Sequence, residues 1–338
     1  MTAGGQRTSS AWRRSLQDLD AKHQRVQNSG IPGRRCYVSH SAGVIQHVSD
    51  TARWVALYRA IESERPDALF HDPYARKLAG DRAERIVASL PKGKRMSWPM
   101  VVRTVVLDEL IQRVVMRDGA DTVLNLAAGL DSRPYRLQLP PQLRWIEVDF
   151  PDMIAYKQEQ LAGARPICTL EQVGLDLTDI PRRQELFTRI AAGSKQTLVV
   201  SEGLLIYLTR EQVAKLAEDL AAQPTFRWWL IDIAGPRILK RMEKTWGRAV
   251  AAGNAPFQFA PAEGTRFFES HGWVEAEFRS MWEEANRLQR VEIPFAWLWS
   301  LLGRLSSERR REEFRRMAGM VLLRRSAGPQ AGAGVRPE

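Results

Sequence analysis

The stretch TVLNLAAGLDSRPYRL, residues 122–137, decides the fold. It opens with an apolar run of β-prone residues that stops at Ala127, and a single glycine, Gly129, follows two positions later. Asp131 and the helix-breaking Pro134 come next. A buried strand that ends in a tight turn before a helix is typical of nucleotide-binding α/β folds, although their turns usually carry several glycines. The stretch therefore predicts a ligand-binding turn, and the missing glycines restrict which ligand it can hold.

Short apolar runs and helical stretches alternate along the chain. Candidate strands lie at 122–126, 144–149, 171–177, 197–203 and 228–235. One helical stretch between them opens with a capping box formed by Thr209 and Gln212. Alternation of this kind predicts a parallel sheet that is covered by helices on both faces. We therefore expect an α/β fold.

An acidic residue, Asp149, ends the second candidate strand and lies 20 positions beyond Gly129. This spacing is typical of a carboxylate that holds a ribose hydroxyl, so an adenosine-type ligand is expected. A dinucleotide needs a glycine-rich turn for its pyrophosphate, whereas Ala127 and Ala128 carry Cβ atoms here and Asp131 adds a carboxylate. S-adenosylmethionine keeps the adenosine but carries a sulfonium, an amine and a carboxylate in place of phosphates. The turn therefore favours S-adenosylmethionine.

Charged residues interrupt apolar runs elsewhere. Glu202 breaks VVSEGLL, and a buried carboxylate there needs a cationic partner, which the amine or sulfonium of the cofactor would supply. Arg103 breaks MVVRTVVL and needs an anionic partner, which is either the methionyl carboxylate of the cofactor or a structural salt bridge. Asp176 and Leu177 follow the third candidate strand. They fit contacts to an adenine ring, and a helix-capping role for Asp176 is the alternative.

The overall composition is that of an ordinary globular protein. Of the 338 residues, 44% are apolar and 26% are charged, and no run approaches the roughly 20 apolar residues that span a bilayer. Cys36 and Cys168 are far apart and match no metal-binding spacing, and the five histidines form no cluster. The start of the chain lacks the apolar core of a secretory signal. We therefore expect a cytoplasmic protein with no transmembrane segment and no metal site.

The net charge of +11 is concentrated at the two ends of the chain. Residues 1–40 carry seven Lys or Arg against two Asp, and residues 304–338 carry nine Arg against four Glu, so each end has a charge of +5. That leaves +1 for the residues between them. Basic arms fit this distribution better than a basic groove does, so specific nucleic-acid binding is not expected.

Several stretches together resemble the leucine carboxyl methyltransferase family. In chain order they are HDPY (71–74), RTVVLDELI (103–111), NLAAGLDSRPYRL (125–137), EVDFPDMIAYK (147–157), DLTD (176–179), SEGLLIYL (201–208) and GWVEAEFRSMWEEANRL (272–288). The resemblance implies a class I methyltransferase, Rossmann-like sheet of seven strands with the last one antiparallel. It also implies an N-terminal helical addition and a late helical insertion that forms a lid. The expected organisation is a basic, disordered arm (1–40), a methyltransferase domain (41–325) with lid elements at about 41–97 and 281–318, and a disordered tail (326–338).

The resemblance also implies roles for single residues. Arg103, joined by Arg53, would hold the cofactor carboxylate, and the turn around Gly129 would hold the methionyl group. Asp149 would hold the ribose. The expected cofactor-binding residues are Arg53, Arg103, Ala127, Gly129, Asp131, Asp149, Phe150, Asp176, Leu177 and Glu202. Glu202 and Tyr207 are the candidates for a catalytic role, and packing is the alternative for Tyr207.

Two functions are compatible with these residues. The first is an S-adenosylmethionine-dependent O-methyltransferase that acts on a carboxylate or hydroxyl of a small, partly apolar metabolite. The second is a non-catalytic scaffold that keeps the cofactor fold. Arg103, Asp149 and Glu202 are all retained, which favours the enzyme. Ala127 departs from the glycine of many relatives, and the region 289–310 is unlike the phosphatase-modifying members, so a small-molecule acceptor is expected; the oligomeric state is left open.

Overall fold

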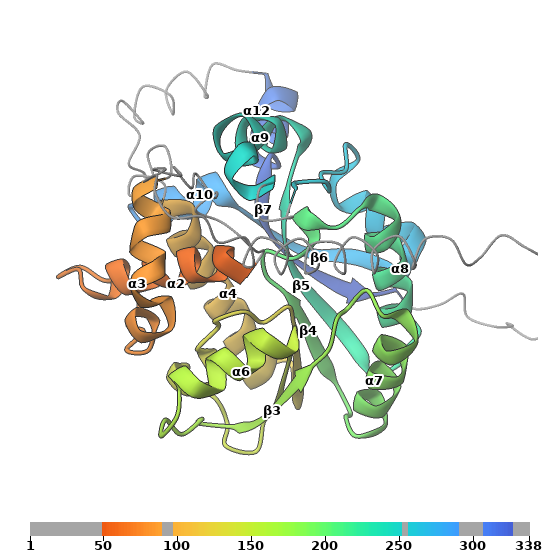
Figure 1. Ribbon diagram of the computed structural model, residues 1–338. Coiled ribbons are helices and arrows are strands. Elements are labelled where there is room, and N and C mark those ends of the chain that lie inside the picture. Colours follow the sequence, from red (N-terminus) through yellow and green to blue (C-terminus); the bar gives the residue numbers. More distant parts are fainter. Residues whose placement is uncertain (1–48, 90–96, 252–255, 291–306, 327–338) are drawn as a thin grey trace, which may run out of the picture. The chain divides into compact units, whose positions relative to one another are not determined.

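The computed structural model describes residues 49–89, 97–251, 256–290 and 307–326, all within the unit 42–338 (Figure 1). Its centre is a seven-stranded sheet in the order β3-β2-β1-β4-β5-β7-β6. The strands are β1 (Thr122–Leu126), β2 (Arg144–Asp149), β3 (Thr169–Gly174), β4 (Thr197–Ser201), β5 (Phe226–Ala234), β6 (Trp273–Ser280) and β7 (Ala318–Arg325). Strands β1 to β5 pair in parallel, and β7 is antiparallel to both of its neighbours. The expected class I methyltransferase sheet is confirmed.

The winding direction of the sheet reverses between β1 and β4. From β1 the chain proceeds outward to β2 and β3, and it then returns to pair β4 on the other side of β1. Ligands of open α/β sheets bind beyond the carboxyl ends of the strands at such a reversal. The carboxyl edge of the sheet, where β1, β2, β4 and β5 end, is therefore where the fold offers a site.

Helices cover both faces of the sheet because each buried strand alternates its side chains between two cores. On β1, Leu124 and Leu126 join one core, whereas Val123 joins the other. The first core contains apolar residues of α7 (Ile180–Ala192), α8 (Arg210–Ala221) and η3 (Gly264–His271). The second contains those of α4 (Trp98–Met116) and α10 (Met281–Arg287). The capping box expected at Thr209 and Gln212 is present at the start of α8.

Helices beyond the sheet form a third core at the carboxyl edge. It joins α2 (Ser49–Ser63) and α3 (Ala75–Ser89) to α9 (Pro236–Ala251), the helix that follows β5. Leu130, in the turn after β1, belongs to the same core. The N-terminal helices therefore pack directly over the expected cofactor turn. The remaining helices are α5 (Arg133–Arg136), η2 (Leu205–Tyr207), α6 (Pro151–Gln160) and α12 (Glu308–Arg315).

Some expectations fall on residues outside the described ranges. Residues 1–48 and 327–338, which contain the expected arm and most of the tail, lie outside them, as do residues 291–306 of the expected lid. The domain boundaries therefore stay predictions. No helix in the described part of the chain is both long and apolar enough to span a membrane.

Candidate functional site

One carboxylate joins the turn after β1 to the turn after β2. The backbone N–H of Gly129 donates to Asp149 Oδ2 at 2.6 Å, and the backbone N–H of Phe150 donates to Oδ1 at 2.7 Å. The turn is tight because both Ala127 and Gly129 have positive φ angles, +51° and +50°. Residues 20 positions apart in the sequence therefore meet at the reversal point of the sheet, as the spacing predicts.

The turn leaves little room for a side chain at Gly129. A Cβ atom there would stand 3.2 Å from the Cβ of Ala52 in α2. Phe150, next to Asp149, is 36% exposed. Asp176 is exposed, and its Oδ1 accepts from the N–H and the hydroxyl of Thr178 at 2.9 and 2.8 Å. Leu177 packs against the first core.

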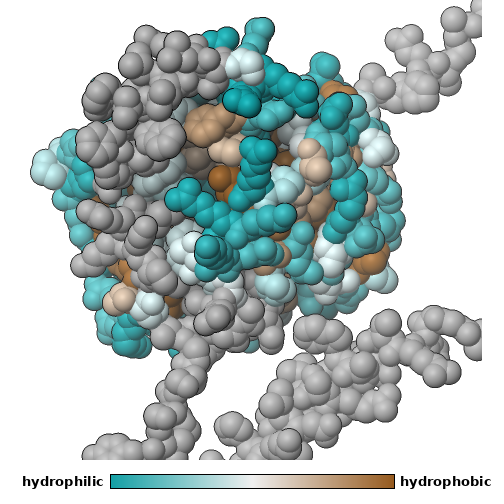
Figure 2. All heavy atoms as spheres, turned by 90° about the horizontal axis from the view of Figure 1, so that it is seen from above, coloured by the Kyte–Doolittle hydropathy of each residue, from teal (hydrophilic) through white to brown (hydrophobic). Residues whose placement is uncertain are grey.

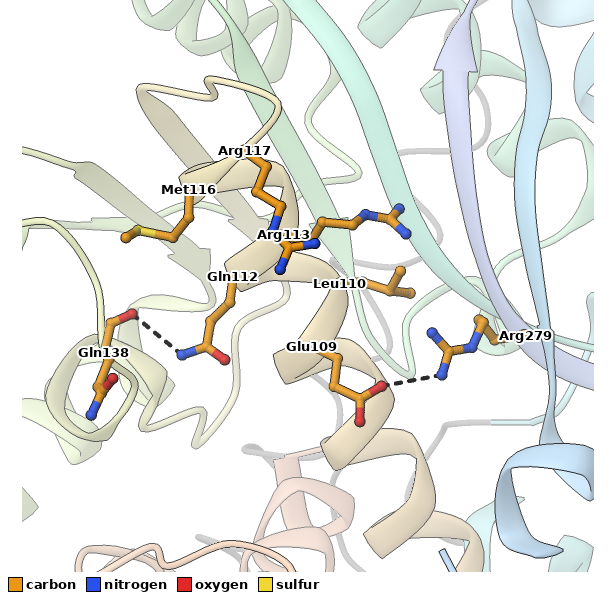
Figure 3. Close-up of a pocket in the computed structure, with 8 residues that line it drawn as sticks. All are labelled: Glu109, Leu110, Gln112, Arg113, Met116, Arg117, Gln138 and Arg279. Carbon is orange, nitrogen blue, oxygen red and sulfur yellow. Dashed lines mark hydrogen bonds and ion pairs between the residues drawn. The ribbon is translucent and has the colours of Figure 1, made fainter. Parts of the chain in front are cut away.

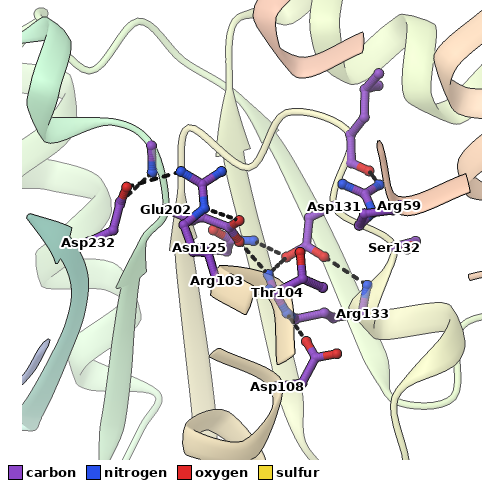
Figure 4. A network of polar contacts seen from close by, with 12 residues as sticks. Arg59, Arg103, Thr104, Asp108, Asn125, Asp131, Ser132, Arg133, Glu202 and Asp232 are labelled. Carbon is purple, nitrogen blue, oxygen red and sulfur yellow. Dashed lines mark hydrogen bonds and ion pairs between the residues drawn. The ribbon is translucent and has the colours of Figure 1, made fainter. Parts of the chain in front are cut away.

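Arg103 reaches from α4 to two carboxylates at the ends of β4 and β5. Its Nε lies 2.9 Å from Glu202 Oε1, and one terminal nitrogen lies 3.0 Å from Asp232 Oδ2 (Figure 4). Asp232 also accepts from the backbone N–H of Gly203 at 2.6 Å. The sequence indicated that Arg103 needs an anionic partner and that Glu202 needs a cationic one. In the structure these two residues pair with each other.

Arg133 holds the middle of the same network. Its guanidinium lies 2.8 Å from Glu202, 2.9 Å from Asp131 and 2.6 Å from Asp108, and its side chain is only 3% exposed. Asp131 accepts a further bond from Asn125 of β1 at 2.8 Å. Figure 4 shows these side chains converging from α4, β1, β4 and the turn after β1. The network therefore ties the cofactor turn to the end of β4.

The charges of this network keep its carboxylates ionised. Burial by itself would raise the pKa of Glu202, but the positive charges of Arg133 and Arg103 lower it below its usual range. Burial by itself would also raise the pKa of Asp131, but the positive charge of Arg133 lowers that pKa below its usual range. Acids with lowered pKa values are weak bases, so these groups are suited to holding cations in place rather than to accepting protons.

Residues 52–221 match the leucine carboxyl methyltransferase family. A protein of Streptomyces coelicolor that is assigned as an S-adenosyl-L-methionine-dependent methyltransferase is 31% identical over 259 residues, which cover 70% of this chain and 86% of that protein. A protein of Parafrankia sp. with the same assignment is 34% identical over 200 residues, 56% of this chain and just under two thirds (64%) of its own length.

The chain belongs to the leucine carboxyl methyltransferase family. The predicted family is confirmed, and with it the enzyme class and the cofactor, S-adenosylmethionine. The fold agrees with that of a solved methyltransferase from Thermobifida fusca, with a TM-score of 0.52, 13% identity, and coverage of 86% of this chain and 99% of that one. At this identity the likeness concerns the fold alone.

Within this methyltransferase, Tyr207 lies beside Arg103 at the carboxyl edge. It stacks on Phe257 with ring centres 5.7 Å apart, and its hydroxyl interacts with Thr51 of α2. Burial raises the pKa of Tyr207 above its usual value, so the phenol stays protonated near neutral pH. Packing and hydrogen-bond donation therefore suit Tyr207 better than action as a base; its catalytic role stays a prediction.

Arg53 stands apart from the Arg103 network in this structure. Its guanidinium lies 3.9 Å from the centre of the Tyr156 ring and donates to the Tyr156 hydroxyl at 2.5 Å. The same group reaches the carbonyl of Ala79 at 3.5 Å. These contacts tie α2 to α3 and α6. The expected contact of Arg53 with the cofactor carboxylate stays a prediction.

Four members of the network were not predicted from the sequence: Asp232, Arg133, Asp108 and Asn125. Asp232 had a signal, because it interrupts the apolar run WWLIDIAG just as Glu202 and Arg103 interrupt theirs. Arg133 follows the polar turn after β1, where an arginine is unremarkable, so its burial could not be seen from its neighbours. No group of three or more potential metal ligands occurs among the residues that the structure describes.

A surface pocket lies away from this site, against the far half of α4. Glu109, Gln112, Arg113, Met116, Gln138 and Arg279 are among the residues that line it (Figure 3). Helix α4 runs from Arg103 at the carboxyl edge to Met116, about 20 Å along its axis, and then leads into the start of β1. The pocket is lined by α4, Gln138 and Arg279 of β6, and none of its lining residues belongs to the cofactor turn.

The positive φ of Ala127 leads to a stability prediction. A left-handed backbone costs an L-residue roughly 1–2 kcal/mol, and glycine adds roughly 0.5–1 kcal/mol of chain entropy. We expect Ala127→Gly to raise the free energy of unfolding by about 0.5–1 kcal/mol, measured by urea titration. Ala128→Gly is the control because Ala128 is buried and its φ is not positive; it should destabilise. Equal destabilisation by both variants would contradict the prediction.

Proposed function

We propose that this protein is an O-methyltransferase that transfers the methyl group of S-adenosylmethionine to a carboxylate or hydroxyl of a small, partly apolar molecule. The observation that carries the proposal is the meeting of two parts at one edge of the sheet. Asp149 joins the turns after β1 and β2, and the Arg103–Glu202 pair stands at the end of β4. The part of the site that would bind adenosine therefore adjoins the charged Arg103–Glu202 pair.

The residues present fit this cofactor. Asp149 is an acceptor for ribose hydroxyls, and Gly129 leaves the turn free of a side chain that would meet Ala52. Phe150 follows Asp149 and is 36% exposed, so its side chain would be a contact for the adenine. When bound, S-adenosylmethionine supplies an electrophilic methyl group. The chain then has to bind and orient the two reactants and exclude water, which are the main contributions that an in-line transfer requires.

The protonation states at the site favour a carboxylate acceptor. A hydroxyl acceptor must lose its proton, whereas a carboxylate is already nucleophilic. Glu202 is a weak base because its pKa is lowered by two arginines, and Tyr207 is protonated because burial raises its pKa. Neither of these two side chains is suited to deprotonate an alcohol near neutral pH.

Calorimetric titration with S-adenosylhomocysteine tests the cofactor site, with NAD as the control ligand. We expect micromolar binding of S-adenosylhomocysteine alone. Asp149→Ala should weaken it by about 1–3 kcal/mol, because the turn loses the acceptor that orders it. Asp152→Ala is the matched control, since Asp152 is exposed in the first turn of α6, and it should bind like the native protein. Binding of NAD alone, or equal binding by both variants, would overturn the assignment.

Turnover with a panel of carboxylic acids and alcohols separates the enzyme from a scaffold. An enzyme forms S-adenosylhomocysteine from S-adenosylmethionine when a suitable acceptor is present. A scaffold binds the cofactor without forming it. Faster turnover of acids than of the matching alcohols would agree with the absence of a strong base at Glu202 and Tyr207.

A further inference from the structure

Asp72, in the HDPY stretch between α2 and α3, joins two distant parts of the chain through its two carboxylate oxygens. Oδ1 makes a local contact, because it accepts from the backbone N–H of Tyr74 at 3.1 Å. Such a bond to the backbone two residues on is the usual role of an aspartate in a turn. Oδ2 makes the long-range contacts: it accepts from the hydroxyl of Ser132 at 2.5 Å and from Nε of Arg59 at 2.8 Å. One oxygen therefore forms the local turn, and the other binds residues 60 and 13 positions away.

Both partners of Oδ2 hold the chain directly after the cofactor turn. Ser132 is the N-cap residue of α5, but its hydroxyl makes no capping bond to that helix and donates to Asp72 instead. Arg59 of α2 donates through a terminal nitrogen to the carbonyl of Leu130 at 2.5 Å. Figure 4 shows Arg59 and Ser132 beside this turn. Asp72 therefore holds the segment 130–132 at both ends, directly at Ser132 and through Arg59 at Leu130.

The carboxylate of Asp72 is both buried and charged. Its side chain is 0% exposed, whereas many hydrophilic side chains lie on the face seen in Figure 2, where water and salt screen their charges. Burial by itself would raise the pKa of Asp72, but the positive charges of Arg59 and Arg136 lower it below its usual range. A buried ion that loses a partner is left poorly compensated. The contacts of Asp72 are therefore harder to break than those of a surface pair, and they can hold the turn in one conformation.

We infer that Asp72 is a positioning residue for the methyl-transfer site, an inference that rests on the function proposed above. It fixes the segment that follows Gly129. The backbone N–H of Gly129 donates to Asp149 Oδ2, and a Cβ at Gly129 would stand 3.2 Å from the Cβ of Ala52 in α2. A shift of this segment by about 1 Å would misplace the groups that orient the cofactor. The N-terminal helices therefore support the cofactor turn and do not merely cover it.

Calorimetric titration of two serine variants with S-adenosylhomocysteine tests the inference. Ser132→Ala removes the hydroxyl that reaches the Asp72 carboxylate. We expect it to weaken binding about five- to tenfold, because the variant has to order the turn when the ligand binds. Ser63→Ala is the matched control, since the Ser63 hydroxyl also bonds to Asp72 but accepts from its backbone N–H at 2.8 Å. The other bond of Ser63 goes to the carbonyl of Arg59 and not to the turn, so this variant should bind like the native protein.

Hydrogen exchange of the Gly129 amide, followed by NMR without ligand, separates positioning from general stability. We expect this proton to exchange about five- to tenfold faster in Ser132→Ala and at the native rate in Ser63→Ala, because only the first variant loosens the turn. Asp72→Asn removes the charge that Arg59 and Ser132 share, so its effects on affinity and exchange should be larger. Ser132→Ala removes a single hydroxyl, so the test stands even if Asp72→Asn does not fold.

The outcomes distinguish the inference from the proposed function. Native affinity or native exchange at Gly129 in Ser132→Ala would overturn the inference and leave the proposed function intact. Equal losses of affinity in Ser132→Ala and Ser63→Ala would also overturn it, because a purely structural role of Asp72 predicts that result. Failure of the native protein to bind S-adenosylhomocysteine would overturn the proposed function and the inference with it.

Discussion

Replacement of Arg133 by methionine is expected to lower the free energy of unfolding by about 3–5 kcal/mol and to abolish cofactor binding. The guanidinium pairs with Glu202, Asp131 and Asp108, and all of these side chains are largely buried. Methionine has a similar length, so the main loss is charge rather than volume. The three carboxylates would then remain largely buried with less positive charge to neutralise them, next to the turn that would hold the cofactor.

Arg76→Met is the matched control for Arg133→Met. Arg76 also pairs with two carboxylates, Glu64 and Glu84, but all three side chains are exposed. Exposed pairs contribute about 0–1 kcal/mol, so this variant should unfold nearly like the native protein. Urea titration followed by circular dichroism measures both variants. If the two variants lost the same stability, the network around Arg133 would not be a main support of the site.

Replacement of Lys157 by methionine is the second large effect, and we expect a loss of about 3–5 kcal/mol at neutral pH. Lys157 Nζ lies 2.7 Å from Glu147 Oε1, and both side chains are fully buried between β2 and α6. Gln172 donates to the other oxygen of Glu147 at 2.9 Å. Without the lysine, Glu147 would be a buried charge with one neutral partner, two residues before Asp149 in the same strand.

The loss in Lys157→Met should depend on pH. Burial raises the pKa of Glu147 in spite of Lys157, and removal of the lysine raises it further. A folded-state pKa above the unfolded value means that the folded protein binds the proton more tightly. The variant therefore gains stability as the pH falls from 7 toward 5, and loses it as the pH rises.

The double variant Glu147→Gln with Lys157→Met separates the pair from its surroundings. It removes both charges, so it should recover much of the stability that the single variant loses at neutral pH. Its stability should also lose the pH dependence expected for Lys157→Met. If Lys157→Met lost the same free energy of unfolding at pH 5 and at pH 7, Glu147 would not be the group responsible for the loss.

The bounds of the central strands could be predicted from the sequence, whereas those of the edge strand β3 could not. The runs 122–126 and 144–149 are strands with those bounds, because every residue of β1 and nearly all of β2 is buried. The third strand was expected at 171–177 but lies at 169–174. It is an edge strand whose register is set by pairing with β2, from Arg144 opposite Thr169 to Asp149 opposite Gly174. The residues of β3 are exposed or only partly buried, so no strong apolar pattern in the sequence marks where this strand begins and ends.

The fourth strand was expected to include Glu202, but it ends at Ser201. Gly203, with φ of +64°, turns the chain there, and its N–H donates to the side chain of Asp232 rather than to the backbone of the neighbouring strand. The sequence marked Glu202 correctly as an unusual charge in an apolar run. It could not show that this charge stands just beyond the strand, where Arg103 of α4 and Arg133 of α5 reach it.

The sequence by itself determined the fold and the part of the site that lies close along the chain. An apolar run, a turn with one glycine and an acid 20 residues later predict the meeting of Gly129 with Asp149, because β1 and β2 are neighbours in nearly every fold of this kind. Only the tertiary structure decided the pairing of Arg103 with Glu202 and Asp232, which are 99 and 129 residues away. Local periodicity records which face of an element is buried. It does not record which distant charge is buried against that face, and the free energy of a buried ion depends on that partner.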